Sequence, residues 1–296
     1  MRRYPEAQDA RHIVISDTEY QFIRELVYRR SRINLGPGKQ ELVSARLGKR
    51  LRATRLSSIG EYCRLLRTPG GEDEVGHLID AISTNHTYFF REESHFATLR
   101  ELILPELLAR RAREHWPALR VWSAACSSGE EPWSIAITLD RQLHGADAWP
   151  WTVQASDISA RVLARARAGV YPPESLARID PALAKAYFET GYAGAAEGLC
   201  RVRPALAARV QFARSNLLAG APPFAGPFHV IFCRNVMIYF DRPTQEELIG
   251  RLTRQLVPGG WLLVGHSESL SGLSHSLRMI RPATWRAPDA AARHDR

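Results

Sequence analysis

The stretch that decides the fold is VWSAACSSGEEP, residues 121–132. Its first part, Val121–Ala125, has the length and character of a short buried strand, and Ser127-Ser128-Gly129 then supplies a turn. Pro132 suits the first turn of a helix because its missing N–H would have no partner there. The stretch therefore predicts a strand, a turn and a helix, the repeating unit of an open α/β sheet. Such sheets bind ligands at the carboxyl ends of their strands.

The same turn predicts which kind of ligand the sheet binds. It carries one glycine, Gly129, and lacks the G-x-G-x-x-G pattern of dinucleotide sites. Glu130 and Glu131 stand where a pyrophosphate would have to lie, so they would repel a dinucleotide and attract a ligand with ammonium and sulfonium groups. This favours S-adenosylmethionine over NAD or FAD. Alternatively, both glutamates only complement the positive end of the helix dipole.

Further apolar runs alternate with helical stretches after about residue 115, as in a parallel sheet. Strands are predicted at residues 152–156, 210–212, 230–233 and 261–265, the last after a turn at Pro258-Gly259-Gly260. Asp157 follows the first of these, where an acid can bind ribose hydroxyls or merely cap the helix that begins near Ser159. Arg234-Asn235-Val236 follows the third, where cofactor and substrate should meet. Asn235 offers a donor and an acceptor there, although it can equally be a turn residue.

Residues 171–209 interrupt this rhythm. They contain a short helical pattern at 183–188, a glycine-bearing loop at 191–194 and an alternating stretch at 199–203. The alternating stretch is typical of one strand of a small hairpin. We therefore expect a β subdomain that is inserted into the sheet domain and projects from it.

The chain before residue 115 is helical in pattern. One helix is predicted from Ser16 or Asp17 to Arg30, and a second over residues 39–55, where Val43, Leu47 and Leu51 recur at i+4 and form a buried stripe. The rest of the second helix is basic, with Arg46, Lys49, Arg50, Arg52 and Arg55. Residues 68–71 are predicted as a loop, and further helices follow through 75–82 and from 94 to 113.

These patterns predict four parts. They are a small all-α domain at 12–83, a linker and lead-in helix at 84–116, an α/β domain at 117–286 with its insertion at about 171–209, and a disordered tail at 287–296.

Composition narrows the class of protein. Hydrophobic residues make up 45% and charged residues 24%, as in soluble globular proteins, and no apolar run approaches a membrane span. The N-terminus lacks the apolar region of a secretory signal. The four cysteines are far apart and form no C-x-x-C pair, which predicts neither a zinc site nor disulfides and favours the cytoplasm. The net charge of +9 suggests an acidic partner, which can be nucleic acid, a membrane surface or a protein face, or only an arginine-rich solvated surface.

Six segments, in order, resemble the chemotaxis-receptor glutamate methyltransferases, the CheR family. The likeness spans roughly residues 15–285. The segments are TNHTYFFRE at 84–92, residues 121–137 with SGEEP, ASDI at 155–158, SNLL at 215–218, residues 231–241 with CRNVMIYF, and GHSE at 265–268.

The resemblance implies an α/β fold: a Rossmann-like S-adenosylmethionine-dependent methyltransferase domain with a small β subdomain, preceded by a small all-α domain. It places Arg91 and Tyr239 near the transferred methyl group as catalytic residues, and it implies no metal. Matched position by position, the cofactor contacts fall on Asn85, Thr87, Arg91, Glu131, Asp157, Asn216, Leu217, Asn235 and Val236.

The resemblance also implies a partner. The five basic residues of the second helix would bind the acidic methylation region in the cytoplasmic domain of a receptor. In some members the β subdomain binds the receptor's C-terminal pentapeptide, and the loop at 191–194 is similar but about one residue longer. We expect a cytoplasmic monomer that is recruited to membrane receptor arrays and does not bind nucleic acid.

Two other functions stay open at this stage. A nucleic-acid methyltransferase would fit the net charge, although Arg234-Asn235-Val236 differs from the Asp/Asn-Pro-Pro-aromatic run of amino-directed DNA methyltransferases. A non-catalytic receptor adaptor that binds S-adenosylmethionine would fit the same cofactor residues. Methylation of another protein carboxylate is a third possibility.

Overall fold

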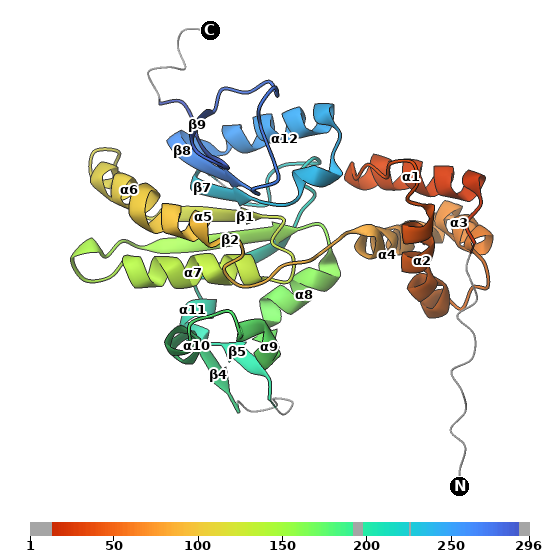
Figure 1. Cartoon of the computed structure of the whole chain (residues 1–296), viewed down its shortest axis with the longest axis horizontal. Coiled ribbons are helices and arrows are strands. Elements are labelled where there is room, and N and C mark those ends of the chain that lie inside the picture. The colour runs from red at the N-terminus through yellow and green to blue at the C-terminus, as the bar shows by residue number, and fades with distance from the viewer. Residues whose placement is uncertain (1–13, 192–197, 225, 290–296) are drawn as a thin grey trace. The chain divides into compact units, whose positions relative to one another are not determined.

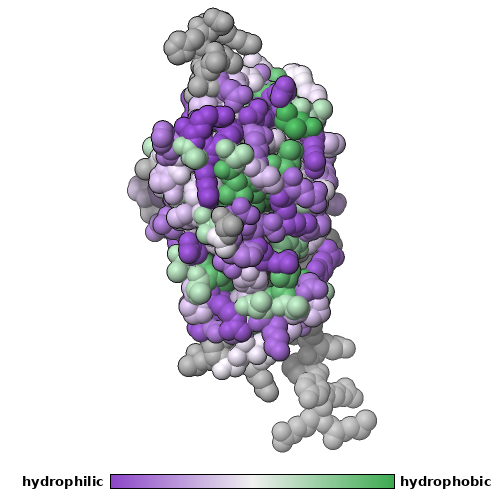
Figure 2. Space-filling view, turned by 90° about the vertical axis from the view of Figure 1, so that its left-hand side faces the viewer, coloured by the Kyte–Doolittle hydropathy of each residue, from purple (hydrophilic) through white to green (hydrophobic). Residues whose placement is uncertain are grey.

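The computed structural model describes residues 14–191, 198–224 and 226–289. The chain divides into two compact units, Met1–Thr84 and Asn85–Arg296 (Figure 1). None of the helices in the described ranges has the length and hydropathy to span a bilayer. On the face shown in Figure 2, hydrophobic residues form small patches among hydrophilic ones.

The first unit is built from helices alone within its described residues. They are α1 (Asp17–Ser31), α2 (Gln40–Thr54), α3 (Ile59–Arg67), a single 3-10 turn η1 (Pro69–Gly71) and α4 (Glu72–Ile82). Ser16 begins α1 with a capping box, in which its side chain and that of Glu19 each accept from the other's backbone N–H. The predicted stripe of α2 is confirmed, since Val43, Leu47 and Leu51 are buried. Where a loop was predicted at 68–71, Pro69 begins the 3-10 turn, because its fixed φ is already helical.

The second unit is organised around a seven-stranded sheet of order β6-β2-β1-β7-β8-β10-β9. The strands that pair in parallel are β1 (Leu119–Ala124), β2 (Trp151–Asp157), β6 (Val210–Arg214), β7 (Phe228–Cys233) and β8 (Leu256–Val264). Two strands that the sequence did not reveal, β9 (Arg278–Arg281) and β10 (Thr284–Arg286), add an antiparallel edge beside β8.

Two layers of helices cover this sheet (Figure 1). Val121 on β1 packs into the core cluster on the α7 side, and Trp122 packs into the cluster on the α12 side, as alternation along a strand requires. The helices are α5 (Glu93–Thr98), the π-helix η2 (Leu99–Ile103), α6 (Leu104–Arg111), α7 (Glu130–Gln142), α8 (Ala160–Ala168) and α12 (Arg242–Arg254), with the 3-10 turns η3 (Gly145–Asp147) and η4 (Met237–Tyr239).

The inserted subdomain has its own three-stranded sheet of order β3-β5-β4. Its strand β5 covers Cys200–Val202, inside the stretch predicted to alternate. The remaining elements are β3 (Val170–Tyr171), α9 (Pro173–Leu176), α10 (Pro181–Tyr187), β4 (Phe188–Thr190) and α11 (Pro204–Ala207). Of the glycine-bearing loop, Tyr192, Ala193 and Gly194 lie outside the described residues.

The helix predicted from 94 to 113 is confirmed as a continuous helical stretch over residues 93–111, with a π-helical segment before Pro105, which lacks the N–H of a regular turn. Two boundary predictions are wrong. Pro258–Gly260 lies within β8 as a bulge, where Gly259 has a φ of 66° and the register with β7 shifts. Arg110 donates to the carbonyls of Pro258 and Gly259 at 2.9 and 3.2 Å. The tail does not begin at 287: Ala287 is buried, and its N–H donates to Gly260. Residues 290–296 lie outside the described ranges.

Candidate active site

The loop after β1 forms one wall of the candidate site. Its backbone is left-handed at Ala125, Ser127 and Gly129, with φ of 69°, 51° and 102°. A Cβ on Gly129 would lie 2.7 Å from the Tyr171 hydroxyl and 2.9 Å from the Ala166 Cα, so only glycine fits. This tight turn lets α7 begin at Glu130, only a few residues after β1 ends at Ala124, at the carboxyl end of the strand.

Asp157, at the end of β2, holds this loop in place. One carboxylate oxygen accepts from the Ser127 N–H at 2.8 Å, and the other accepts from the Ser159 N–H at 2.9 Å. The cap of α8 is Ser159, whose side chain accepts from Val162, so the interpretation of Asp157 as the helix cap is wrong. The N–H of Ser215 donates to the Asp157 carbonyl, which brings the loop with Asn216 and Leu217 to the same edge.

A segment that precedes α5 completes this side of the site. The Ser127 hydroxyl donates to the Asn85 carbonyl at 3.0 Å. The side-chain nitrogen of Asn85 is buried and has no hydrogen-bond partner among the described residues. A buried donor without an acceptor is costly, about 1–3 kcal/mol. This unmatched amide fits a ligand acceptor, so the residues present are compatible with a bound S-adenosylmethionine.

Arg234, which the sequence analysis quoted without a role, is the centre of a buried charge network. Its side chain is 1% exposed and lies 2.9 Å from Glu131 and 3.0 Å from Glu92. It also donates to the Arg91 carbonyl. Ser123 donates to Glu131 at 2.6 Å. Burial raises the pKa of Glu131, and the Arg234 guanidinium opposes that rise.

This network corrects the electrostatic prediction made from the turn. Glu131 was expected to face the ligand as a free charge, but Arg234 already neutralises it. Glu130 is buried and accepts from the Ser128 hydroxyl at 2.7 Å, and burial raises its pKa as well. The two carboxylates after the turn therefore do not make the loop strongly negative, and they give no electrostatic reason to exclude a pyrophosphate.

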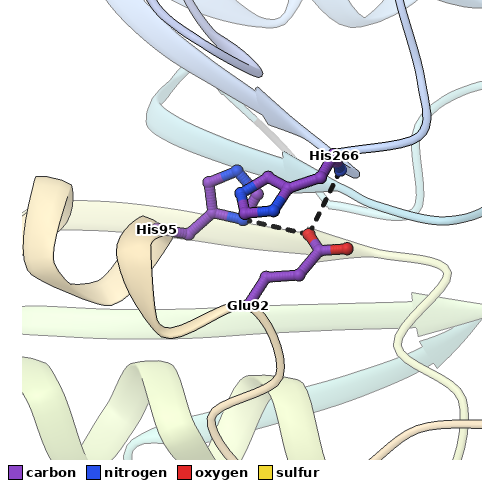
Figure 3. A group of neighbouring side chains, drawn as sticks. All are labelled: Glu92, His95 and His266. Atoms are coloured by element: carbon purple, nitrogen blue, oxygen red, sulfur yellow. Dashed lines mark hydrogen bonds and ion pairs between the residues drawn. The ribbon is translucent and has the colours of Figure 1, made fainter.

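Glu92 accepts hydrogen bonds from several parts of the chain (Figure 3). Besides Arg234, it accepts from the side chain of Asn235 at 3.3 Å and from the backbone of His266 at 3.3 Å, and it lies 3.3 Å from Nδ1 of His95. Burial alone would raise the pKa of Glu92, but His95 and Arg234 hold it well below its ordinary value. Burial lowers the pKa of His95, and the neighbouring Glu92 opposes that effect.

Glu92, His95 and His266 are also the group of side chains in the described residues whose geometry could hold a metal ion, with one ligand atom from each within 4.8 Å. A cation there would compete with the Arg234 guanidinium for the same Glu92 oxygen. Within this group, Glu92 supports the loop that follows β7, because it accepts from Arg234 and Asn235.

That loop is held from the other side by Glu268. Its two oxygens accept from the backbone N–H groups of Asn235 at 2.8 Å, Met237 at 2.7 Å and Gly265 at 2.6 Å. Asn235 has a φ of 58°, a left-handed conformation that its environment must maintain. Burial raises the pKa of Glu268, against the opposing effect of these backbone donors. Glu268 thus joins the ends of β7 and β8 and fixes where Asn235 points.

The structure brings most of the predicted cofactor residues to this one edge of the sheet. Asn85, Arg91, Glu131, Asp157 and Asn235 are linked by the contacts above. Thr87 is half-buried between Asn85 and Arg91 along the chain, and Leu217 and Val236 pack against the core on the α12 side. Arg91 is half-buried and donates to the His86 carbonyl at 2.8 Å, and Tyr239 lies half-buried in η4.

The predicted substrate-binding residues of α2 divide into two groups. Arg50 makes a bidentate pair with the buried Glu74 at 2.9 and 2.7 Å, and Arg46 donates to the Ile82 carbonyl and, at 2.7 Å, to Thr84. These two side chains stabilise the helical unit and are a poor choice as free receptor contacts. Lys49, Arg52 and Arg55 are exposed.

Fold and site are compatible with one class of protein. A mostly parallel sheet with a tight first turn that lacks the dinucleotide glycine pattern, and with polar loops gathered at the ends of its strands, suits an S-adenosylmethionine-dependent methyltransferase domain. Family models match both units: CheR methyltransferase, all-alpha domain, over residues 18–83, and CheR methyltransferase, SAM binding domain, over residues 85–285. The chain belongs to the CheR methyltransferase family.

Curated relatives agree with this assignment. The chain is 45% identical over 268 residues to the chemotaxis protein methyltransferase of Klebsiella aerogenes, covering 90% of this chain and 89% of the relative. It is 44% identical to that of Escherichia coli, covering 90% and 89%, and 44% identical to chemotaxis protein methyltransferase 2 of Pseudomonas aeruginosa, covering 88% and 90%.

Proposed function

We propose that this protein transfers the methyl group of S-adenosylmethionine to glutamate side chains of chemotaxis receptors and so forms glutamate methyl esters. The observation that carries the proposal is the family match over both units. It is supported by the contacts that link Glu131 and Asn235 through Arg234 and Glu92. Family membership decides against a non-catalytic adaptor and gives no support to a nucleic-acid substrate.

The methyl transfer needs the protein mainly to position the two reacting groups. A glutamate side chain has an ordinary pKa of about 4.3, so it is already a nucleophile at pH 7 and needs no general base. S-adenosylmethionine supplies a methyl group on a positively charged sulfur, which is a good leaving group. The residues must therefore align the carboxylate oxygen with that methyl and exclude water from it.

Several residues are placed for these tasks. The Asn85 amide, Asp157, Asn216 and the Asn235 loop would hold S-adenosylmethionine. The Arg91 guanidinium is anchored by the His86 carbonyl and lies over the ring of Tyr88, 5.9 Å from its centroid. So anchored, it can steer an incoming carboxylate without a tight ion pair, which would lower the nucleophilicity of that carboxylate. Tyr239 would line the same place from η4.

The receptor-facing surface that we propose is the exposed part of α2, Lys49, Arg52 and Arg55. It would place the enzyme on the cytoplasmic side of the membrane, at receptor arrays, through an acidic region of the receptor. Binding of a receptor's C-terminal pentapeptide by the β subdomain, and action as a monomer, belong to the same proposal.

The test is to incubate the protein with S-adenosylmethionine labelled in its methyl group and with membranes that contain chemotaxis receptors. We expect label on the receptors that is released by mild base, as an ester requires. Arg91→Ala should lose most of this label. Label that resists base, or label on added nucleic acid in place of receptor, would refute the assignment. If Arg91→Ala left both transfer and cofactor binding unchanged, the role given to Arg91 would be wrong.

A further inference from the structure

A cavity of about 560 Å³ opens in the second unit, among residues that, apart from Tyr88, the proposed reaction does not use. Tyr88, Phe89 and Phe90 line it together with the C-terminal half of α7, the start of α10 and the α5–η2 segment. None of the predicted cofactor residues belongs to its wall. Its volume is within the range of about 300–1,000 Å³ that is typical of small-molecule sites.

The charges around this cavity are unbalanced. Its two acids are both engaged: Glu93 accepts from Arg100 at 3.1 Å, and Asp180 caps α10 by accepting from the N–H groups of Ala182 and Leu183. Arg141 and Arg178 are exposed and form no ion pair with another described residue. With Arg100, the wall therefore carries three arginines against two acids, and two of those arginines form no ion pair among the described residues.

Apart from Tyr88, Thr138 and Gln142, the rest of the wall is apolar. Phe89 and Ile179 are buried, and Ile137 and Leu183 contribute further aliphatic surface. A site of this kind suits a ligand with a flat apolar body and one anionic group, since guanidinium binds carboxylate, sulfonate and phosphate in a planar, bidentate way. Inorganic anions would gain nothing from the apolar wall, and neutral aromatics nothing from the arginines.

The cavity is coupled to the reacting end of the site through Tyr88. The Arg178 guanidinium lies 4.4 Å from the centroid of the Tyr88 ring, and that of Arg91 lies 5.9 Å from the same centroid. The N–H of Phe90 donates to Ser134 on α7 at 2.9 Å, so the backbone beside Arg91 is fixed. An anion that pairs with Arg178 would draw that guanidinium away from the Tyr88 ring. The ring could then move, and the guanidinium of Arg91, which lies over the same ring, would move with it.

We propose that this cavity is a regulatory site for a small aromatic anion, and that its occupation lowers the rate of methyl transfer. The regulatory half of the proposal rests on the proposed function, because its readout is receptor methylation. The binding half is independent of that function and can be measured without a receptor.

The binding test uses 8-anilinonaphthalene-1-sulfonate, a flat aromatic sulfonate whose fluorescence increases in apolar sites. We expect saturable binding of one molecule per chain that excess S-adenosylhomocysteine does not displace. 1-Naphthoate should compete, and the neutral 1-naphthylmethanol should not. Displacement by S-adenosylhomocysteine, or equal competition by the neutral compound, would overturn the proposal.

Substitutions locate the site. Arg141→Ala with Arg178→Ala should weaken binding of the dye at least about tenfold, and each single change about threefold, whereas Arg161→Ala, an exposed arginine of α8, should have no effect. Unchanged S-adenosylhomocysteine affinity and thermal unfolding will show that the variants are folded. Equal dye binding by the double variant and the wild type would place the dye elsewhere and refute the site.

The regulatory test adds 1-naphthoate to the receptor methylation assay. We expect naphthoate to lower the rate of the wild type and of Arg161→Ala. The double variant, in which Tyr88 has already lost Arg178, should start from a lower rate that naphthoate does not change. If the wild-type rate is unchanged at saturating naphthoate, the cavity is not regulatory. If no methylation occurs even without naphthoate, the proposed function fails, while the dye titration still decides the binding site.

Discussion

Two charged regions of this protein use arginine in opposite ways. At the edge of the sheet, Arg234 is 1% exposed and paired with two carboxylates, so its position is fixed by what surrounds it. On α2, Lys49, Arg52 and Arg55 point into solvent. The first region is preorganised for a small ligand, and the second suits a partner that can supply the missing negative charges. A buried charge is sensitive to the loss of its partners, whereas an exposed charge is sensitive to salt.

The largest expected effect tests the buried region. Arg234→Ala leaves Glu92 and Glu131 without their cation, and breaking a buried ion pair typically costs about 3–5 kcal/mol. We expect that loss in the free energy of unfolding by urea, together with loss of S-adenosylhomocysteine binding. The matched control is Arg242→Ala, which removes an exposed pair with Glu246 at 3.7 Å and should cost less than about 0.5 kcal/mol. If both variants lost a similar free energy of unfolding, the contrast between the buried and the exposed arginines would be wrong.

The second effect is a dependence of the free energy of unfolding on pH, which we expect from a buried histidine of the sheet unit and not from the exposed charges of α2. Burial lowers the pKa of His229 from 6.5 to about 4, while its ring accepts from the Arg120 N–H at 3.0 Å. The His229 ring therefore binds a proton more readily in the unfolded chain than in the folded one. As a result, the part of the free energy of unfolding that His229 contributes above pH 6.5 is lost as the pH falls toward 4. A shift of this size corresponds to about 3 kcal/mol.

Urea unfolding between pH 7 and pH 4 measures this dependence. His229→Gln keeps an acceptor for Arg120 and cannot titrate, so its curve should be flatter than that of the wild type by most of that amount. His95, whose pKa is also lowered by burial, acts in the same direction and will leave a smaller slope. Parallel curves for the variant and the wild type would show that His229 is not the group responsible.

A third effect concerns the position of a loop more than its stability. Glu268→Gln replaces one acceptor oxygen by a donor that faces backbone N–H groups of Asn235, Met237 or Gly265. We expect S-adenosylhomocysteine affinity to fall about tenfold, or 1.4 kcal/mol, because Asn235 loses its orientation. Calorimetry measures this fall. Gln245→Ala removes the side-chain donor to the nearby Met237 carbonyl and is the control, with a smaller expected effect. An unchanged affinity in Glu268→Gln would contradict the positioning role.

The fold was largely readable because its signals are local. The apolar run of β1, the turn at Gly129 and the i+4 stripe of α2 each lie within one short stretch and predict the element that forms there. The strands β9 and β10 were missed because they pair antiparallel at the edge, and β9 is largely exposed, so no buried run marks it.

The site was readable only in part, because its contacts join distant segments. Glu92, Arg234 and Glu268 all lie in the segments that resemble the family, yet a single sequence gives no sign that Glu92 meets Arg234 across 142 positions. For the same reason Arg50 was interpreted as a receptor contact: its pairing with Glu74 on another helix is invisible in the pattern of α2. Charge patterns show where cations are, and only the fold shows which of them are already paired.

The smallest expected effect tests the exposed region. Reversing Lys49, Arg52 and Arg55 to glutamate removes exposed charges that form no ion pair with the residues that the structure describes, so we expect little change in unfolding or in S-adenosylhomocysteine affinity. Receptor methylation should fall severalfold at low salt, because exposed charges attract an acidic partner within a screening length of about 8–10 Å. The difference from wild type should shrink as salt is raised. Arg50→Glu is the contrasting variant: it places a second carboxylate beside Glu74 and should destabilise the helical unit itself. If the triple reversal left methylation unchanged at low salt, the acidic region of the receptor would have to bind elsewhere, and the exposed charges of α2 would be only a solvated surface.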